Sequence, residues 1–173
     1  MELPEYLRSL QQAELGLADS YAHVAGSQPD DEANRTLFLA LASQGREHAR
    51  ALDTFLQRYP AAAGSAPDDK MHPPQSDGDR PDRFLAFQDL YLSACLVDVG
   101  WAVLMQAGRG LEDRDLVRVV EHCSSETGKQ LAWIKTRIKH AAGPTLLRPR
   151  MHVAGSRPAG RTPLASSPSG ARP

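Results

Sequence analysis

The chain has 173 residues, of which 41% are apolar and 24% charged, and its formal net charge is −1. This composition predicts one soluble globular domain and excludes a fibrous chain or one that is disordered throughout. The near-zero charge gives no general attraction to nucleic acid, and no unbroken apolar run reaches the ~18 residues of a membrane span. The acidic start does not resemble a secretory signal, and the only cysteines are Cys95 and Cys123, so we expect a cytoplasmic protein without a disulfide framework.

The first predicted helix runs from Leu3 to Gly26. Its apolar residues recur at alternating spacings of four and three, which places them on one stripe of a helix. They are Leu3, Leu7, Leu10, Leu17, Tyr21 and Val24. Glu14 interrupts this stripe near its middle, so we expect one carboxylate to face the interior.

The second predicted helix follows the turn at Pro29–Asp31 and runs to about Tyr59, where Pro60 stops it. The connection before it is short, so the first two helices are expected to be antiparallel neighbours. The predicted inward stripe contains Leu37, Leu41, Gln44, His48, Phe55 and Tyr59. Gln44 and His48 are therefore polar residues on an otherwise apolar face.

Residues 60–83 show no helical periodicity and are rich in Pro, Ala, Gly, Ser and Asp, which predicts a long connection. The third predicted helix begins near Phe84 and ends at Gly108–Gly110, with Asp98 as the acid on its inward stripe. Short links before and after one long connection favour a bundle of four helices with a single crossover between the second and third.

The fourth predicted helix begins after Asp113 and ends at Gly143–Pro144. Its inward stripe comprises Leu116, Val120, Cys123, Thr127, Ile134 and Ile138. Glu126 lies on a flanking stripe. Residues 144–173 contain five arginines and no acid among many Pro, Ser, Gly and Ala residues, which predicts a disordered tail after a helical domain over 1–143. The tail arginines are too scattered to predict a nucleic-acid site.

The predicted stripes turn Glu14, His48 and Asp98 toward the interior, one from each of the first three helices, and Glu126 on the flanking stripe of the fourth helix is the candidate for a fourth such group. A single histidine on an apolar face is more often a hydrogen-bonded core residue than a ligand. Four such groups together need a common cause, because buried charges are costly unless they are paired or bind a metal.

The stretch Leu41–Leu52, with His48 followed by Ala49, resembles the second helix of rubrerythrin-type proteins, which belong to the ferritin-like superfamily. Glu126 resembles the acid of that family's second Glu-x-x-His motif, and Glu14 and Asp98 resemble its two single acids. The resemblance covers about residues 3–142. It implies an all-α, ferritin-like four-helix bundle with one long crossover and a centre for two iron or manganese ions.

Two positions depart from that family's motifs, because Gly45 stands in place of a ligand glutamate and Lys129 in place of a ligand histidine. The glycine removes an oxygen ligand and the ammonium group repels a divalent metal, so no metal cofactor is expected. Lys129 is instead a candidate partner in a buried ion pair with the acids.

Three functions remain open. The leading hypothesis is a non-catalytic, self-associating interaction module, such as a homodimer, with a degenerate di-metal site. The second is an iron- or manganese-dependent oxidoreductase whose ligands are Glu14, His48, Asp98 and Glu126. The third is a scaffold that binds a protein partner through its basic tail.

Overall fold

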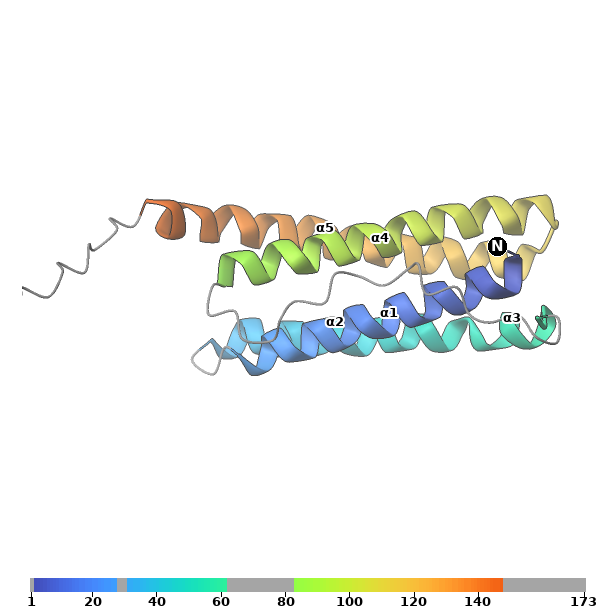
Figure 1. Cartoon of the computed structure of the whole chain (residues 1–173), viewed down its shortest axis with the longest axis horizontal. Coiled ribbons are helices and arrows are strands. Elements are labelled where there is room, and N and C mark those ends of the chain that lie inside the picture. The colour runs from blue at the N-terminus through green and yellow to red at the C-terminus, as the bar shows by residue number, and fades with distance from the viewer. Residues whose placement is uncertain (1, 28–30, 62–82, 148–173) are drawn as a thin grey trace, which may run out of the picture.

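The computed structural model describes residues 2–27, 31–61 and 83–147. Within these ranges the chain forms helices and no strand, which confirms the predicted all-α class (Figure 1). The helices are α1 (Leu3–Gly26), α2 (Glu32–Ala51), α3 (Asp53–Arg58), α4 (Arg83–Gly110) and α5 (Arg114–Leu146). Four of them are long, and α3 is a short continuation of α2.

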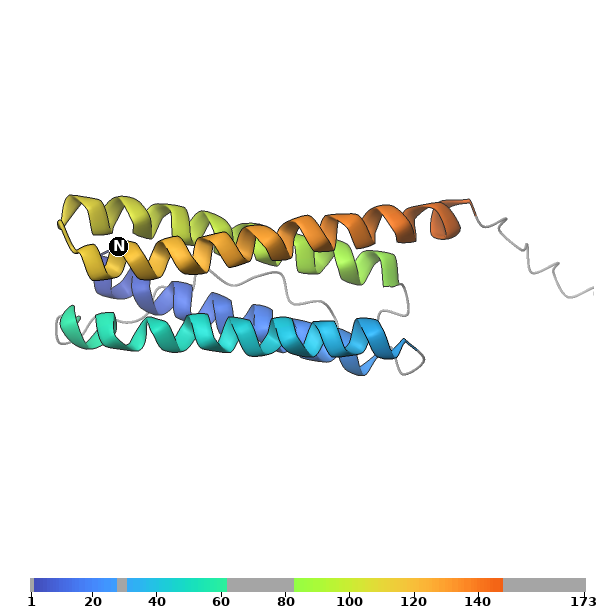
Figure 2. The ribbon, with the colours of Figure 1, turned by 180° about the vertical axis from the view of Figure 1, so that it is seen from behind.

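The four long helices lie side by side in two antiparallel pairs (Figures 1 and 2). α1 packs along α2 and α4 packs along α5, while α1 also contacts α4 and joins the two pairs. α3 ends at one end of the molecule and α4 begins at the other (Figure 1). The expected crossover falls almost entirely on residues 62–82, outside the described residues.

The core takes one apolar stripe from each long helix, but on α2 the buried residues are Phe38 and Ala42, whereas the predicted Leu37 and Leu41 are only half-buried. Its largest fully buried side chains include Trp101, Tyr21, Phe38, Leu7, Leu10, Leu17, Leu104, Leu116 and Ile134. Two glycines let α1 approach its neighbours closely. A Cβ atom at Gly100 would lie 2.5 Å from Leu10 Cδ1, and one at Gly45 would lie 3.2 Å from Ala18 Cβ. Both glycines are therefore packing positions between helices.

The second helix differs from the prediction, because α2 ends at Ala51 and α3 begins at Asp53. The Ala49 carbonyl accepts hydrogen bonds from Leu52 N–H at 3.3 Å and from Gln11 Nε2 at 2.9 Å. Gln11 Nε2 also donates to Asp53 Oδ1 at 2.7 Å. These bonds tighten the backbone at Leu52 and divide the helix, so one continuous helix to Tyr59 was wrong.

The predicted end of the last helix at Gly143–Pro144 was also wrong. α5 continues to Leu146 with Pro144 inside it, and Leu147 N–H donates to Gly143 O at 3.1 Å. A proline removes its own N–H donor and its ring crowds the carbonyl four residues earlier, yet close to a helix end the chain can continue for another turn when the flanking bonds hold. Residues 148–173, the rest of the predicted tail, lie outside the described ranges.

α4 is the one helix in the described ranges that is long and apolar enough to cross a membrane by length and composition alone. Its most apolar 18-residue window has a mean hydropathy of 1.5, and 39% of that window is buried between helices. The core helix of a soluble protein meets the same criterion. The expectation of a cytoplasmic chain without a membrane span stays a prediction.

Asp113 joins the end of α3 to the start of α5. One carboxylate oxygen caps α5 by accepting from Asp115 N–H and Leu116 N–H, both at 3.1 Å. The other accepts from Arg58 Nη1 at 2.6 Å and from Tyr59 OH at 2.8 Å. Burial raises the pKa of Asp113, but the bonds from Arg58, Leu116 N–H and Tyr59 outweigh it and lower the pKa to about 2.

We expect Asp113→Ala to lower the free energy of unfolding by about 1 to 3 kcal/mol, because it removes a helix cap and leaves the Tyr59 hydroxyl without its hydrogen-bond acceptor. Asp115→Ala, at an exposed position of the same turn, should change it by less than about 0.5 kcal/mol. Urea unfolding followed by circular dichroism measures both. Equal effects from the two substitutions would contradict the role given to Asp113.

Candidate functional site

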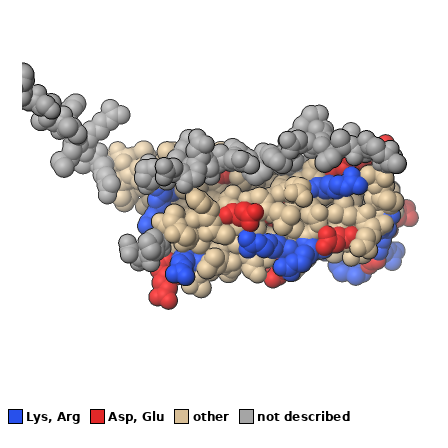
Figure 3. All heavy atoms as spheres, turned by 60° about the horizontal axis from the view of Figure 1, so that its bottom comes forward, with Lys and Arg blue, Asp and Glu red and all other residues tan. Residues whose placement is uncertain are grey.

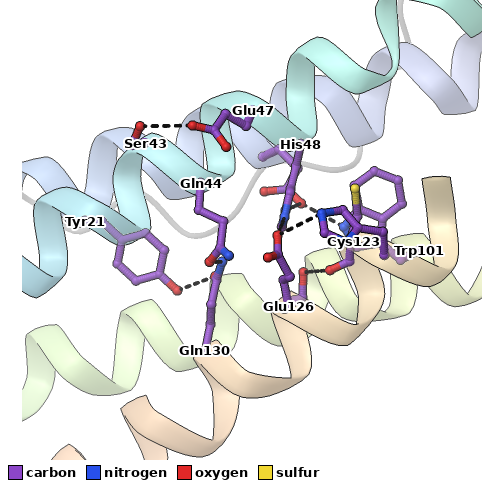
Figure 4. Close-up of polar contacts among 12 residues, drawn as sticks. Tyr21, Ser43, Gln44, Glu47, His48, Trp101, Cys123, Glu126 and Gln130 are labelled. Carbon is purple, nitrogen blue, oxygen red and sulfur yellow. Dashed lines mark hydrogen bonds and ion pairs between the residues drawn. The ribbon is translucent and has the colours of Figure 1, made fainter.

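Three of the predicted residues, Glu14, His48 and Glu126, meet between the helices around the imidazole of His48, and Figure 4 labels His48 and Glu126. His48 Nδ1 lies 3.0 Å from Glu14 Oε1, and His48 Nε2 lies 2.9 Å from Glu126 Oε2. The side chains of Glu14 and His48 are 1% and 2% exposed, and that of Glu126 is 24% exposed. α1, α2 and α5 thus place an acid, a base and a second acid in line, from the deep interior toward the surface.

α4 contributes Trp101 to the same group. Its indole Nε1–H donates to Glu14 Oε1 at 2.7 Å, and its ring meets the His48 ring edge-to-face with centroids 6.0 Å apart. Glu14 Oε1 therefore accepts from two donors on two different helices. We refer to Glu14, His48, Trp101 and Glu126 as the polar cluster.

Gly45 makes room for the polar cluster one turn before His48. A Cβ atom at this position would lie 3.4 Å from Glu14 Oε2 and 3.4 Å from the Glu14 carbonyl oxygen. The carboxylate of Glu14 thus lies beside the backbone of α2, in space that a side chain larger than glycine at position 45 would partly fill.

Within the polar cluster, His48 and the two glutamates shift one another's pKa values toward the charged forms of His48 and Glu126. Burial lowers the pKa of His48, but hydrogen bonds and the negative charges of Glu14 and then Glu126 outweigh it, so the pKa lies above its ordinary value. The hydrogen bond from His48 lowers the pKa of Glu126, against the opposing effect of burial. Because each ring nitrogen faces a carboxylate oxygen, the arrangement suits an imidazolium that donates in both directions.

A second row of polar side chains lies one turn along the helices from His48. Tyr21 OH donates to Gln130 Oε1 at 3.0 Å, and Gln130 Nε2 donates to Gln44 Oε1 at 2.8 Å (Figure 4). A hydrogen bond from Gln44 also helps to lower the pKa of Glu126. Burial, and then the charge of Glu14, raise the pKa of Tyr21, so its hydroxyl stays protonated as a donor.

Two groups at the margins of the cluster have different roles. His122, on the surface of α5 with a 71% exposed side chain, places Nε2 3.5 Å from Glu126 Oε2. The buried thiol of Cys123 has a pKa raised to about 12 by burial and by the charges of Glu14 and Glu126. Cys123 is thus a neutral thiol without nucleophilic character, and both Cys95 and Cys123 are free.

Asp98 and Lys129 are not where the sequence predicted them. Asp98 is half-buried on α4, and Trp101, one turn later, makes the contact of that helix with the cluster. Lys129 is exposed, because the buried stripe of α5 passes through Thr127 and Gln130 instead. A buried ion pair of Lys129 was therefore wrong, and the basic side chain beside the acids is His48.

The residues of the cluster do not fit a di-metal centre. Within residues 2–27, 31–61 and 83–147 no group of three or more His, Cys, Asp or Glu side chains is arranged to hold a metal ion. Both nitrogens of His48 face carboxylate oxygens at hydrogen-bond distance, so neither presents a lone pair to a shared metal position. Gly45 offers no ligand, and Asp98 is not brought into the cluster.

Sequence reasoning missed Trp101, Tyr21 and Gln130 as members of these polar rows. The helical spacing of Tyr21 and Trp101 predicts that both belong to the core, and both are fully buried there. The spacing carried a signal for Tyr21, because it lies on the same stripe as the buried acid Glu14. A buried Tyr or Trp needs a partner for its polar atom, and inward acids or amides are the natural ones.

The chain matches no protein-family model, and no curated protein is similar enough to it in sequence to count as a relative.

We expect His48→Leu to lower the free energy of unfolding by about 3 to 5 kcal/mol, because it leaves the Glu14 carboxylate buried without its cation. Adding Glu14→Gln should restore part of this loss, since the neutral amide keeps an acceptor for Trp101. His122→Leu, at the exposed end, serves as the control and should change stability by less than about 0.5 kcal/mol. Additive effects of His48→Leu and Glu14→Gln in chemical denaturation would show that the two side chains are not coupled.

The pKa shifts of His48 and Glu126 determine how the free energy of unfolding should change with pH. His48 has a raised pKa in the folded state, so its contribution is complete below its unfolded pKa of about 6.5 and is lost as the pH rises through the folded value. Glu126 has a lowered pKa, so its contribution is complete above its unfolded pKa of about 4.3 and is lost as the pH falls through the folded value. The stability difference between the parent and His48→Leu should therefore be largest between about pH 4.5 and 6.5 and shrink at alkaline pH. A difference that grows steadily to pH 10 would contradict this assignment.

Proposed function

We propose that this chain is a non-catalytic, ferritin-like four-helix bundle that acts as an interaction module, with a protonated histidine in place of a metal centre. The observation that carries the proposal is the pair of hydrogen bonds from the two His48 ring nitrogens to Glu14 and Glu126. The antiparallel order of the long helices and the resemblance of Glu14, His48 and Glu126 to family ligands support it.

The imidazolium supplies the positive charge that buried carboxylates require. Glu14 is 1% exposed, and its oxygen accepts from both His48 and Trp101. Charge-assisted hydrogen bonds of this kind can hold buried acids in a fixed place without a metal. The buried polar cluster thus serves to hold the interior together. Under this proposal, the surface that contacts a partner lies on the outward faces of the helices.

A metal-dependent oxidoreductase is the competing function. It would use iron or manganese with Glu14, His48, Glu126 and Asp98 as ligands. His48 would first have to release at least one carboxylate, and Asp98 would have to reach the cluster. A scaffold that binds partners through its tail is a third candidate, but the tail after residue 147 lies outside the described residues.

Metal analysis of protein purified without chelator tests the proposal, together with ¹⁵N NMR of the histidine rings. We expect far less than one iron or manganese per chain, and a His48 ring that is protonated at both nitrogens at pH 6. His122→Ala is the matched control for assigning the His48 signals. Near-stoichiometric metal that His48→Ala abolishes and His122→Ala leaves intact would overturn the proposal in favour of the oxidoreductase.

A further inference from the structure

The second half of α5 presents an exposed face whose charged residues are all basic. Lys129, Lys135 and Lys139 are exposed, and among the described residues none of the three forms an ion pair. The last acid before them, Glu126, is engaged by His48 at 2.9 Å. The basic face of α5 is defined here as its exposed residues in this half: Ser125, Gly128, Lys129, Ala132, Lys135, Thr136, Lys139 and His140.

The net charge of −1 comes from two parts of the chain with opposite charge. All 21 Asp and Glu residues precede Thr127, whereas nine of the 20 Lys and Arg residues follow it. Four of these nine lie on α5, and the other five fall within residues 148–173, outside the described ranges. No acid further along the chain therefore offsets the positive charge of α5.

α1 and α2 carry their surface charges in a different arrangement. Acidic and basic side chains are interspersed along these two helices, as Figure 3 shows. Arg46 and Asp19, for example, form an ion pair there with Nη2 and Oδ1 3.0 Å apart. Pairing of this kind cancels most of the local electrostatic potential, whereas unpaired lysines of one sign add to it. The basic face of α5 is therefore suited to a negatively charged partner.

The shape of the basic face suits an extended partner. Lys129 and Lys135 lie about 120° apart around the helix axis, one on each side of a line of short side chains. The line has spacings of three, four and four and consists of Ser125, Gly128, Ala132 and Thr136. A Cβ atom added at Gly128 would meet nothing within 4 Å, so this line is open to a partner.

The end of α5 is accessible from several sides. α5 projects beyond the first turn of α4, as Figures 1 and 2 show. Its last residue, Leu146, and the following Leu147 are 69% and 81% exposed. A long partner can therefore approach this end of α5 more freely than the middle of the bundle.

We propose that the basic face of α5 binds the phosphate backbone of a double-stranded nucleic acid, independently of its base sequence. A duplex carries about one negative charge per 1.7 Å of its axis, and the three lysines extend over roughly 15 Å of helix. They therefore meet phosphates wherever the duplex lies along the face. Lysine binds phosphate as a point charge, and such contacts carry no base specificity.

An anionic lipid surface is the competing occupant, because it would also attract lysines. Helices that lie on membranes combine basic residues with large apolar side chains such as Trp, Phe and Leu, which enter the hydrocarbon. The basic face of α5 has no such side chain, and Ala132 is its one apolar member apart from glycine. Charge without apolar groups fits the backbone of a nucleic acid better than a membrane.

This inference rests on the proposed function and deepens it, because it names the surface and the partner of the interaction module. It does not depend on the state of His48. A protein without metal that fails to bind a duplex would overturn this inference alone. A protein that binds a duplex and also holds stoichiometric metal would overturn the proposed function alone.

Fluorescence anisotropy of the full chain with a labelled DNA duplex of about 20 base pairs tests the site. We expect Lys129→Gln combined with Lys135→Gln to weaken binding at least about tenfold at about 100 mM salt. The slope of log K against log salt concentration should become shallower by about two, because two phosphate contacts are lost.

Arg35→Gln combined with Arg50→Gln is the matched control, because it removes the same charge from exposed positions of α2. It should leave the affinity within about twofold of the parent. Circular dichroism establishes that both double variants are folded. An RNA duplex of the same length serves as a second probe, and the lysine pair should weaken its binding as well, since the contacts are to phosphates.

Three results would overturn the proposal: no binding by the parent at about 50 mM salt, equal weakening by the two double variants, or a lysine effect confined to one of the two duplexes. Flotation of the parent with phosphatidylserine vesicles provides the remaining test. Vesicle binding that the lysine pair abolishes, in a protein that binds neither duplex, would overturn the proposal in favour of a membrane.

Discussion

The interior of this protein depends on compensating the negative charge of Glu14. A carboxylate that is 1% exposed is tolerated only where donors surround it, and here they come from His48 on α2 and Trp101 on α4. His48 in turn requires Glu126 on α5 for its second nitrogen. One buried charge therefore fixes the relative placement of all four long helices, which apolar packing alone specifies less strictly.

Close packing and charge compensation act at the same positions. Gly45 brings α2 against α1 and leaves space for the Glu14 carboxylate, and His48 follows one turn later on the same helix. Gly100 brings α4 against α1 at Leu10, and Trp101 is the next residue. In both cases a glycine shortens the distance between helices beside the residue that must reach Glu14. The polar contacts are short because the backbones are close.

Periodicity predicted the helices and the inward direction of Glu14 and His48, because a stripe recurs over many residues and tolerates small errors of phase. It failed at Asp98, where the assignment depended on one turn of one helix, and the interior placement of Lys129 came from the resemblance to a metal-binding motif and not from periodicity. Lys129 is one residue before buried Gln130, and about 100° of helical rotation separates buried from exposed. The break at Leu52 could not be predicted either, because it involves Gln11 on another helix.

The pairing of the helices has a consequence for the order of folding. α1 with α2, and α4 with α5, make the most extensive contacts, and each pair joins elements adjacent in the chain. The cluster instead links positions as far apart as Glu14 and Glu126. Contacts of such high sequence separation pay the largest loop-closure entropy, so the two helical hairpins should form before the charged interior closes. The contacts of the buried polar cluster would then form late in folding. Such contacts mainly slow the unfolding of the protein, because they hold the α1–α2 and α4–α5 hairpins together in the native state.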